Sequence, residues 1–260
     1  MRQRAVCQSS APTATPHETP MSDPVRLSKR LAELVGCSRA DAQRYIENGW
    51  VRVDGQVIEA PRHAVTTERV ELDPDAALEA PEPATMLLHK PAGFDTIAGR
   101  QPAAALVTPA RRWAEDASGV RLLQRHFDRL TPLVPLEAAA SGLMVLTQDG
   151  RVWRRLSEDA AQIEQEYIVE VSGDIAPYGL RRLNHGLRFQ GRELAPCKVS
   201  WQNEFRLRFA LKDVQPGQIP DMCAQVGLRV VAMRRLRIGK VSLAKMPPGE
   251  WRYLPVGERF

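Results

Sequence analysis

The 260-residue sequence predicts an α+β protein made of a small N-terminal module and a larger C-terminal domain. Three observations predict this fold class. Residues 25–73 combine helical spacing of apolar residues with a turn between short strand-like runs. Residues 74–84 are acidic and rich in Pro and Ala, which is typical of a linker. From Thr85 onward, strand-like runs alternate with helical patterns.

The composition is that of an ordinary globular protein with a modest excess of positive charge. Hydrophobic residues make up 43% of the chain, and no apolar run reaches the length of a membrane span. The N-terminus lacks the apolar core of a secretory signal, so we expect a cytoplasmic protein with no membrane partner. The net charge of +5 fits a polyanionic partner without requiring one. We expect reduced thiols and no metal site, because no Cys-x-x-Cys pair or clustered histidine occurs among Cys7, Cys37, Cys197 and Cys223.

Residues 1–24 are rich in Ser, Thr, Pro, Ala and Gln and contain few large apolar side chains. This composition buries too little apolar surface to order a chain, so we expect a disordered tail. Met21 stands just before the expected start of order, which marks residues 1–20 as a candidate upstream extension of the reading frame.

The module at 25–73 begins with two short predicted helices. Apolar residues from Leu27 to Val35 follow helical spacing. Ser38 is placed to cap a second helix from about Arg39 to Glu47, and Gly49 is placed to stop it. The predicted strands of the module lie at 50–53, 56–58 and 68–72, with an Asp-Gly turn between the first two.

The domain at 85–260 is predicted to hold short strands and helices. A strand that runs into a turn is expected within 85–93, and further strands at 143–146, 166–173, 197–202 and 205–211, and within 228–243. Helices are expected within 177–187 and 218–227. The Asp149-Gly150 pair is expected to form a turn.

Basic side chains crowd the N-terminal module. Three of them share one face of its first helix, and others lie at or near the start of the second helix, where backbone N–H groups favour a phosphate. This arrangement suits contact with a nucleic-acid backbone, and the alternative is a solvated basic face without a ligand. The candidate RNA-binding residues of the module are Arg26, Lys29, Arg30, Ser38, Arg39 and Arg44.

The stretch RLSKRLAELVGCSRADAQRYIENGWVRVDGQVI resembles the S4-type (alpha-L) RNA-binding domain of ribosomal proteins and RNA-modifying enzymes. The resemblance covers nearly the whole module, including Ser38-Arg39, Gly49 and Asp54-Gly55. It implies that the module recognises structured RNA by shape more than by sequence.

The domain at 85–260 resembles the RsuA/RluF-type RNA pseudouridine synthases. The matching motifs include LLHKPAG at 87–93, SGL at 141–143, LTQDG at 146–150, Glu166-Tyr167 and GEWR at 249–252. The resemblance implies a mixed, largely antiparallel sheet flanked by helices, with an RNA cleft across it. It also implies a monomer that binds structured RNA, ribosomal RNA above all, and that uses no metal or cofactor.

Such enzymes flip a uridine from its stack, detach its base from the sugar and rejoin it through carbon. The resemblance implies a carboxylate at the sugar, and cations that keep this carboxylate charged and hold the phosphate of the flipped nucleotide. By the same resemblance, Tyr167 matches the active-site tyrosine and Lys90 is a candidate RNA contact.

The loop before Ser141 departs from the family. The family's loop reads Gly-Arg-Leu-Asp, two residues, Thr, and then Ser-Gly-Leu, whereas this chain has Glu137 at the catalytic Asp position and Ala140 at the Thr position. Glu keeps the charge but displaces the carboxylate by about 1 Å, and a misplacement of about 1 Å can lower a rate on the order of a hundredfold.

Five positions that carry a cation in the family are also replaced: Pro135, Gln165, Gly217, Pro220 and Asp221. We therefore expect an RNA-binding protein whose isomerase activity is lost or weak. The alternative is an active RNA pseudouridine synthase, acting on ribosomal or transfer RNA, in which Glu137 works with help from Arg129, Arg234 or Arg235.

The remaining polar residues of this domain have structural interpretations. His89 is expected to pack in the protein or bind RNA rather than to catalyse. His126 and Asp128 lie in a polar stretch and are expected at the surface. The alternating run Met233–Lys240 is expected to give one face of a strand a basic stripe.

Overall fold

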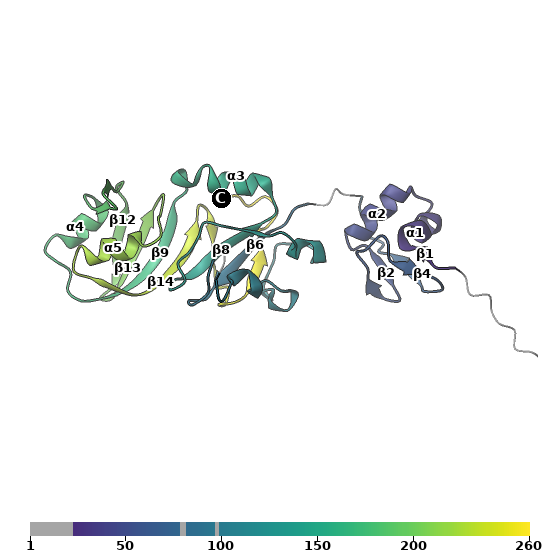
Figure 1. Cartoon of the computed structure of the whole chain (residues 1–260), viewed down its shortest axis with the longest axis horizontal. Coiled ribbons are helices and arrows are strands. Elements are labelled where there is room, and N and C mark those ends of the chain that lie inside the picture. The colour runs from purple at the N-terminus through teal and green to yellow at the C-terminus, as the bar shows by residue number, and fades with distance from the viewer. Residues whose placement is uncertain (1–22, 79–81, 97–98) are drawn as a thin grey trace, which may run out of the picture. The chain divides into compact units, whose positions relative to one another are not determined.

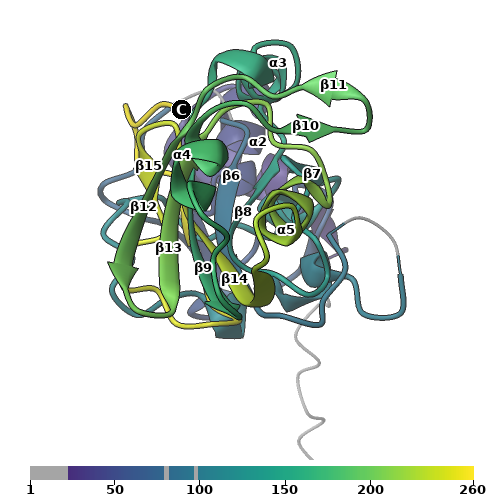
Figure 2. The ribbon, with the colours of Figure 1, turned by 90° about the vertical axis from the view of Figure 1, so that its left-hand side faces the viewer.

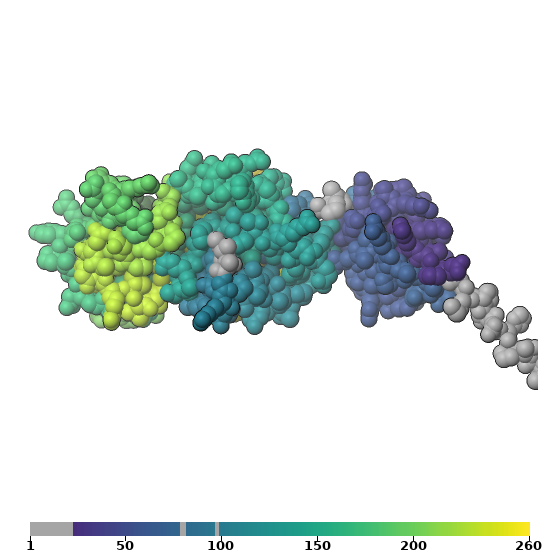
Figure 3. Space-filling view, viewed as in Figure 1, coloured from purple at the N-terminus to yellow at the C-terminus, as the bar shows by residue number. Residues whose placement is uncertain are grey.

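The computed structural model describes residues 23–78, 82–96 and 99–260, and within it the chain divides into two units, Met1–Pro81 and Glu82–Phe260 (Figure 1). The tail expected at 1–24 lies outside the described residues except for Asp23 and Pro24, as do residues 79–81 of the expected linker. In the space-filling view, the teal, green and yellow segments of the second unit form one continuous surface (Figure 3).

The first unit contains the two predicted helices, α1 (Leu27–Val35) and α2 (Arg39–Glu47). Ser38 caps α2, because its Oγ accepts a hydrogen bond from the backbone N–H of Asp41 at 3.1 Å. The apolar faces of both helices meet the strands in one small core, formed by Leu27, Leu31, Ala42, Ile46, Val51, Val53 and Val65.

The strands of the first unit form two small sheets. One has the order β3-β2-β5, and in the other β1 pairs with β4. Asp54 and Gly55 both have positive φ, at 48° and 82°, which gives the tight turn that their sequence predicts between β2 and β3. The bounds are β1 (Val25–Arg26), β2 (Val51–Val53), β3 (Gln56–Val57), β4 (Ala64–Val65) and β5 (Val70–Leu72).

The second unit is built on a nine-stranded sheet with the order β12-β13-β9-β14-β8-β6-β16, in which β7 also pairs with β8 and β15 with β14. β8 and β14 run parallel and every other pair is antiparallel, so the predicted mixed, largely antiparallel sheet is confirmed. The bounds are β6 (Thr85–Lys90), β7 (Thr131–Leu133), β8 (Ser141–Thr147), β9 (Gln165–Ser172), β12 (Lys198–Asn203), β13 (Arg206–Leu211), β14 (Arg229–Ile238), β15 (Val241–Ser242) and β16 (Trp251–Tyr253).

Helices cover the sheet through three apolar clusters. α4 and α5 share a core with Val169, Leu207 and Phe209 of the sheet, whereas α3 packs Leu156 in a separate core with Val145 of β8. A hairpin of β10 and β11 lies beside α5 (Figure 2). The bounds are α3 (Gly150–Ser157), α4 (Gly179–Asn184), α5 (Gln218–Ala224), β10 (Arg188–Phe189), β11 (Arg192–Glu193), and the 3₁₀ turns η1 (Ala103–Leu106), η2 (Pro109–Arg111), η3 (Gln124–Phe127) and η4 (Ala160–Gln162).

The Asp149-Gly150 pair starts a helix instead of the turn that the sequence suggested. Asp149 Oδ1 accepts from the backbone N–H of Arg151 at 2.8 Å, which caps α3. An Asp-Gly pair suits either a turn or a helix start, and here the apolar side of α3 packs on β8.

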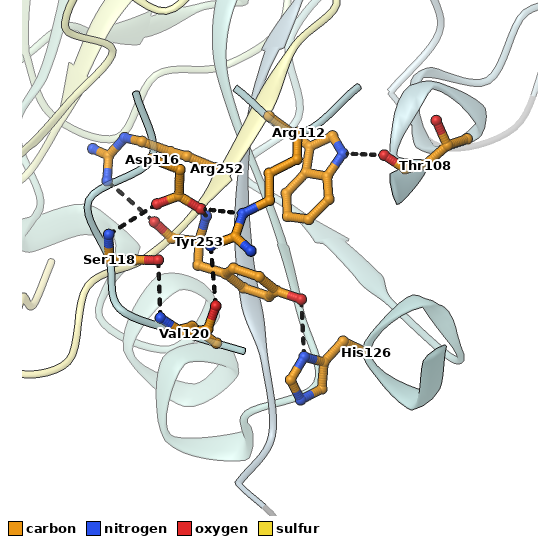
Figure 4. Close-up of polar contacts among 9 residues, drawn as sticks. Thr108, Arg112, Asp116, Ser118, Val120, His126, Arg252 and Tyr253 are labelled. Atoms are coloured by element: carbon orange, nitrogen blue, oxygen red, sulfur yellow. Dashed lines mark hydrogen bonds and ion pairs between the residues drawn. The ribbon is translucent and has the colours of Figure 1, made fainter. Parts of the chain in front are cut away.

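The edge strand β16 anchors a buried polar network (Figure 4). Trp251 Nε1 donates to the carbonyl of Thr108 at 2.7 Å, and His126 Nδ1 lies 2.9 Å from Tyr253 Oη. His126 is only 3% exposed, so the expectation that it lies at the surface is wrong. Burial, with repulsion from Arg125, lowers the pKa of His126 to about 4, so the ring is neutral at physiological pH.

Asp116 lies at the centre of the same network. Its Oδ2 accepts from Arg112 Nε at 2.8 Å, and its Oδ1 accepts from the backbone N–H of Ser118 at 3.0 Å (Figure 4). Burial alone would raise the pKa of Asp116, but these hydrogen bonds outweigh it and hold the pKa below its usual value. The Arg112 guanidinium also lies over the Tyr253 ring, 4.9 Å from its centroid. No helix in the described part of the chain is long and apolar enough to cross a membrane.

Candidate functional site

Glu137 lies on the loop between β7 and β8, and its side chain is half-buried. Its neighbours Leu136 and Ala140 are buried in the core that α4 and α5 cover. Thr96 holds the loop backbone, because its Oγ1 donates to the Leu136 carbonyl at 2.5 Å and accepts from the Leu136 N–H at 3.0 Å. The loop that carries the carboxylate is therefore fixed on both sides of Leu136.

The Glu137 carboxylate meets a backbone donor at the start of α5. Its Oε1 accepts from the N–H of Gly217 at 2.6 Å. Gly217 has a φ of 79°, a conformation that favours glycine, and a Cβ there would have Phe189 as its nearest neighbour at 3.9 Å. The resemblance implies an arginine partner at position 217, and in this chain a backbone N–H supplies the hydrogen bond to the anion instead.

Arg235 is completely buried and joins the loop to the sheet. Its Nη2 donates to the Val134 carbonyl at 2.8 Å, its Nη1 to the Pro135 carbonyl at 3.3 Å and its Nε to the Leu143 carbonyl at 2.8 Å. These bonds satisfy a cation that would otherwise be costly to bury, and they fix the course of the loop. The sequence marked Arg235 only as one of three possible helpers, because alternation along 233–238 places it on the same face as Arg237, and only the structure shows that it is buried.

Gly142 allows Arg235 and β8 to approach closely. Its φ is 118°, and a Cβ at this position would lie 2.3 Å from the carbonyl oxygen of Arg235. Gly142 is therefore required by the parallel contact between β8 and β14.

Tyr167 and Gln165 extend this buried polar cluster. Tyr167 is 2% exposed, and its hydroxyl donates to Gln165 Oε1 at 2.8 Å. The same Gln165 oxygen accepts from Arg235 Nη1 at 3.2 Å. Gln165, which stands where the resemblance implies a cation, links the tyrosine to the arginine that holds the loop.

The other two suggested helpers do not lie with Arg235. Arg234 is exposed and adjoins Arg235 in β14, so its side chain is on the opposite face of the sheet. Arg129 lines a cavity with Thr147 at the far end of β8 from the loop. Of the three, only Arg235 contacts the loop that bears Glu137.

Lys90 is fully buried, which does not agree with the expectation that it contacts RNA directly. Its ammonium donates to the carbonyls of Phe94 at 2.7 Å, Pro91 at 3.1 Å and Ala138 at 3.3 Å. Burial, with repulsion from Arg235, lowers the pKa of Lys90 to about 8. Lys90 therefore binds the protein's own backbone, including the residue that follows Glu137.

His89 also has a structural role. It is 4% exposed, and its Nδ1 lies 2.7 Å from the carbonyl of Met246. Burial lowers its pKa, which keeps the ring neutral. The expectation that His89 packs rather than catalyses agrees with this contact.

The two remaining replaced positions lie on α5. Pro220 and Asp221 are both half-buried, and Asp221 Oδ2 accepts from Gln225 Nε2 at 2.7 Å. Neither side chain can supply a cation to the loop or to a phosphate.

The six candidate RNA-binding residues of the first unit are exposed. Two of these cations have acidic neighbours on their own helix: Lys29 lies 4.0 Å from Glu33, and Arg44 lies 3.7 Å from Asp41. Such exposed pairs are weak and leave a cation available to an incoming phosphate. The Ser38 hydroxyl is engaged in capping, because it also donates to Asp41 Oδ2 at 2.7 Å.

The comparisons with known proteins agree with this architecture. Residues 25–70 match the S4 domain family. A crystal structure of a pseudouridylate synthase aligns with a TM-score of 0.56 at 20% identity, covering 89% of this chain and 96% of that one. Fold and site together thus define the class, which is an S4 domain followed by a pseudouridine synthase fold.

Two relatives give the family. The ribosomal small subunit pseudouridine synthase A of Pseudomonas aeruginosa is 33% identical over 239 residues, covering 90% of this chain and 98% of that protein. The dual-specificity RNA pseudouridine synthase RluF of Escherichia coli K12 is 29% identical over 237 residues, covering 88% of this chain and 75% of that protein. The chain belongs to the RsuA/RluF-type family of RNA pseudouridine synthases.

Proposed function

We propose that this protein is an RNA pseudouridine synthase in which Glu137 occupies the place of the usual catalytic aspartate. The observation that carries the proposal is the Glu137 carboxylate, half-buried on a fixed loop and bound to the N–H of Gly217 at 2.6 Å. The relatives named as pseudouridine synthases support this alternative over the expectation of a lost activity.

In this reaction the N1–C1′ bond of a uridine breaks, a C5–C1′ bond forms, the proton on C5 leaves, and N1 takes up a proton. The isomerisation is redox-neutral and its atoms balance without a co-reactant. The chain contributes a carboxylate at the flipped nucleotide, oriented by the backbone of Gly217. Arg235, Lys90 and Thr96 fix the loop through its carbonyls, so the reach of the longer Glu side chain is set by a rigid backbone.

A second candidate function is RNA binding without isomerisation. One observation favours it: no cation stands at positions 135, 165, 217, 220 and 221, where the resemblance implies cations. The Arg235 guanidinium makes its bonds to protein carbonyls and to Gln165, which occupies the donors that a substrate phosphate would need. On this account the protein would hold an RNA site without modifying it.

The RNA is proposed to be structured ribosomal RNA, bound in the cytoplasm by a monomer. The named substrate of the Pseudomonas aeruginosa relative supports ribosomal RNA. The S4 domain supports recognition of folded RNA, since its exposed cations lie on a small helical surface.

Tritium release from ribosomal RNA labelled at C5 of uridine tests the proposal. The purified wild-type chain should release tritium, and Glu137→Gln, which keeps the shape but removes the charge, should lower release by about a hundredfold or more. Equal release by both proteins would contradict the role of Glu137. Binding of the RNA without release by either protein would establish the second candidate.

A further inference from the structure

A cavity of about 720 Å³ lies at the end of the sheet remote from Glu137. Glu137 lies in the loop that leads into the first residue of β8, Ser141. The cavity is lined by Thr147, which is the last residue of β8, and by Trp153 of α3. Seven residues of strand separate the two ends of β8, which corresponds to roughly 20 Å. The cavity is therefore separate from the loop that carries the catalytic carboxylate.

The walls of this cavity are held in place by one half-buried side-chain amide, that of Gln148. Gln148 Nε2 donates to the carbonyls of Arg125 at 2.7 Å and Asp128 at 2.5 Å, while its Oε1 accepts from the N–H of Ala84 at 3.1 Å. Arg129, next to Asp128, has a φ of 52°, a conformation that residues other than glycine adopt only where the surroundings hold them. The rim of the cavity is thus built before any ligand arrives.

The side chains that face the cavity combine an aromatic plane with charge. Trp153 is 44% exposed, an unusual exposure for so large an apolar side chain. Asp128 and Arg129 are exposed, and Arg125 is half-buried.

The lining carries charged side chains of both signs. Asp149 also lines the cavity, but its Oδ2 lies 2.9 Å from the guanidinium of Arg151. Arg129 and Asp128 are then the exposed charged side chains of the lining. The site fits a ligand that has a planar ring, N–H donors for a carboxylate and one anionic group.

A nucleotide has all three features. We propose that this cavity holds one unpaired nucleotide of the bound RNA, with its base against Trp153, base N–H groups toward Asp128 and its phosphate at Arg129. The proposal depends on the RNA binding put forward above, and it holds whether or not Glu137 isomerises uridine.

The path of the chain supports RNA rather than a free nucleotide as the source. Ala84, which Gln148 binds, directly precedes β6, so the residues that lead into the second unit lie beside this cavity. An RNA held by a tethered S4 domain would be presented here at a high effective concentration.

Binding of two labelled RNAs by the full-length chain tests the proposal. One probe is a hairpin, and the other is the same hairpin with a single-stranded extension of five nucleotides. Trp153→Ala should weaken binding of the extended hairpin about tenfold, in the range of one base–aromatic stack, and leave the plain hairpin unchanged. Arg129→Ala should weaken the extended hairpin and reduce its salt dependence by about one phosphate contact.

Matched controls and a rescue complete the test. Tyr178→Ala removes an aromatic side chain that is 80% exposed and lies outside the cavity. Arg192→Ala removes an exposed cation. Neither control should change the affinity for either RNA. Trp153→Phe should restore most of the affinity. Wild-type affinity of both cavity variants for the extended hairpin would overturn the proposal, as would an equal loss on both probes. Tight binding of a free mononucleotide without any effect on the RNAs would also overturn it. Unchanged tritium release by a variant that binds the extended hairpin less tightly separates this site from the isomerase.

Discussion

At the scale of single residues, the length of the Glu137 side chain is matched to a donor in the backbone. The carboxylate reaches the N–H of Gly217 at 2.6 Å, in a region where the resemblance implies a shorter Asp and a longer Arg. The longer Glu side chain at 137 and the missing side chain at 217 thus compensate for each other, because the added methylene covers part of the distance that an arginine side chain would have covered.

This match predicts that Glu137→Asp will be harmful. Shortening the side chain withdraws the carboxylate by about 1 Å and breaks the bond to Gly217, so tritium release should fall by roughly tenfold to a hundredfold. The same substitution should also shift the NMR resonance of the Gly217 amide, and this shift reports the lost hydrogen bond in the absence of substrate. Higher activity in Glu137→Asp would mean that the loop still has the geometry of an aspartate enzyme.

His126 predicts a pH dependence of stability. Its pKa is lowered from 6.5 to about 4 because it is buried, so the folded chain binds fewer protons than the unfolded chain between these values. The stabilisation that comes from keeping His126 neutral should therefore be fully present above pH 6.5. The free energy of unfolding should fall as the pH drops from 6.5 toward 4, by at most about 3 kcal/mol. His126→Gln can still bond to Tyr253 but does not titrate, and urea unfolding at pH 7.5 and 5 should show a smaller decrease for this variant. His89 leaves part of the slope, because burial lowers its pKa as well. An unchanged slope in His126→Gln would contradict the assignment.

At the scale of elements, the parallel junction of β8 and β14 sets the position of the loop. Gly142→Ala would place a Cβ 2.3 Å from the Arg235 carbonyl oxygen, with backbone on both sides of the contact. We expect a loss of about 3 kcal/mol or more in the free energy of unfolding, or failure to fold. Gly150→Ala is the matched control, because a Cβ at the first residue of α3 has nothing within 4 Å. Chemical denaturation of both variants measures the difference, and equal stability would show that the strands can separate at little cost.

Sequence spacing was sufficient to locate elements whose pattern is local. α1 and α2 show regular apolar spacing and a Ser cap, and β12 and β13 alternate as paired strands, so all four lie where the sequence predicts. β16 and the hairpin of β10 and β11 were missed, because strands of three and two residues carry too few alternations to detect. α3 was missed because its Asp-Gly start has the composition of a turn, and only packing on β8 distinguishes the two.

The site could be predicted only in part. Glu137, Tyr167 and the replaced cations follow from motif order, and each is a matter of sequence alone. The bond from Gly217 to Glu137 joins positions 80 residues apart, and the burial of Lys90 and His126 depends on strands far along the chain. A polar residue in a polar stretch is usually exposed, and only tertiary packing reverses that expectation.

At the scale of the whole molecule, the chain combines an S4 domain with a pseudouridine synthase fold. We expect the S4 domain to supply much of the RNA affinity through charge. Replacing Arg26, Lys29 and Arg30 by Ala in the full-length chain should weaken binding of structured ribosomal RNA and reduce the salt dependence by up to about three phosphate contacts.

The control for this prediction removes the same charge from the second unit. It replaces three exposed cations, Arg192, Lys198 and Lys212. Filter binding across a salt series compares the two triple variants. Equal loss in both would mean that net charge, rather than the module, determines affinity.

The central claim is that Glu137 makes this protein an isomerase of ribosomal RNA, and a pseudouridine map of total ribosomal RNA tests it most directly. The map is made from cells that carry the gene, cells that lack it, and cells in which it encodes Glu137→Gln. We predict at least one pseudouridine that is present in the first cells and absent from the other two. Identical maps from all three would contradict the claim and leave RNA binding without isomerisation as the function of this chain.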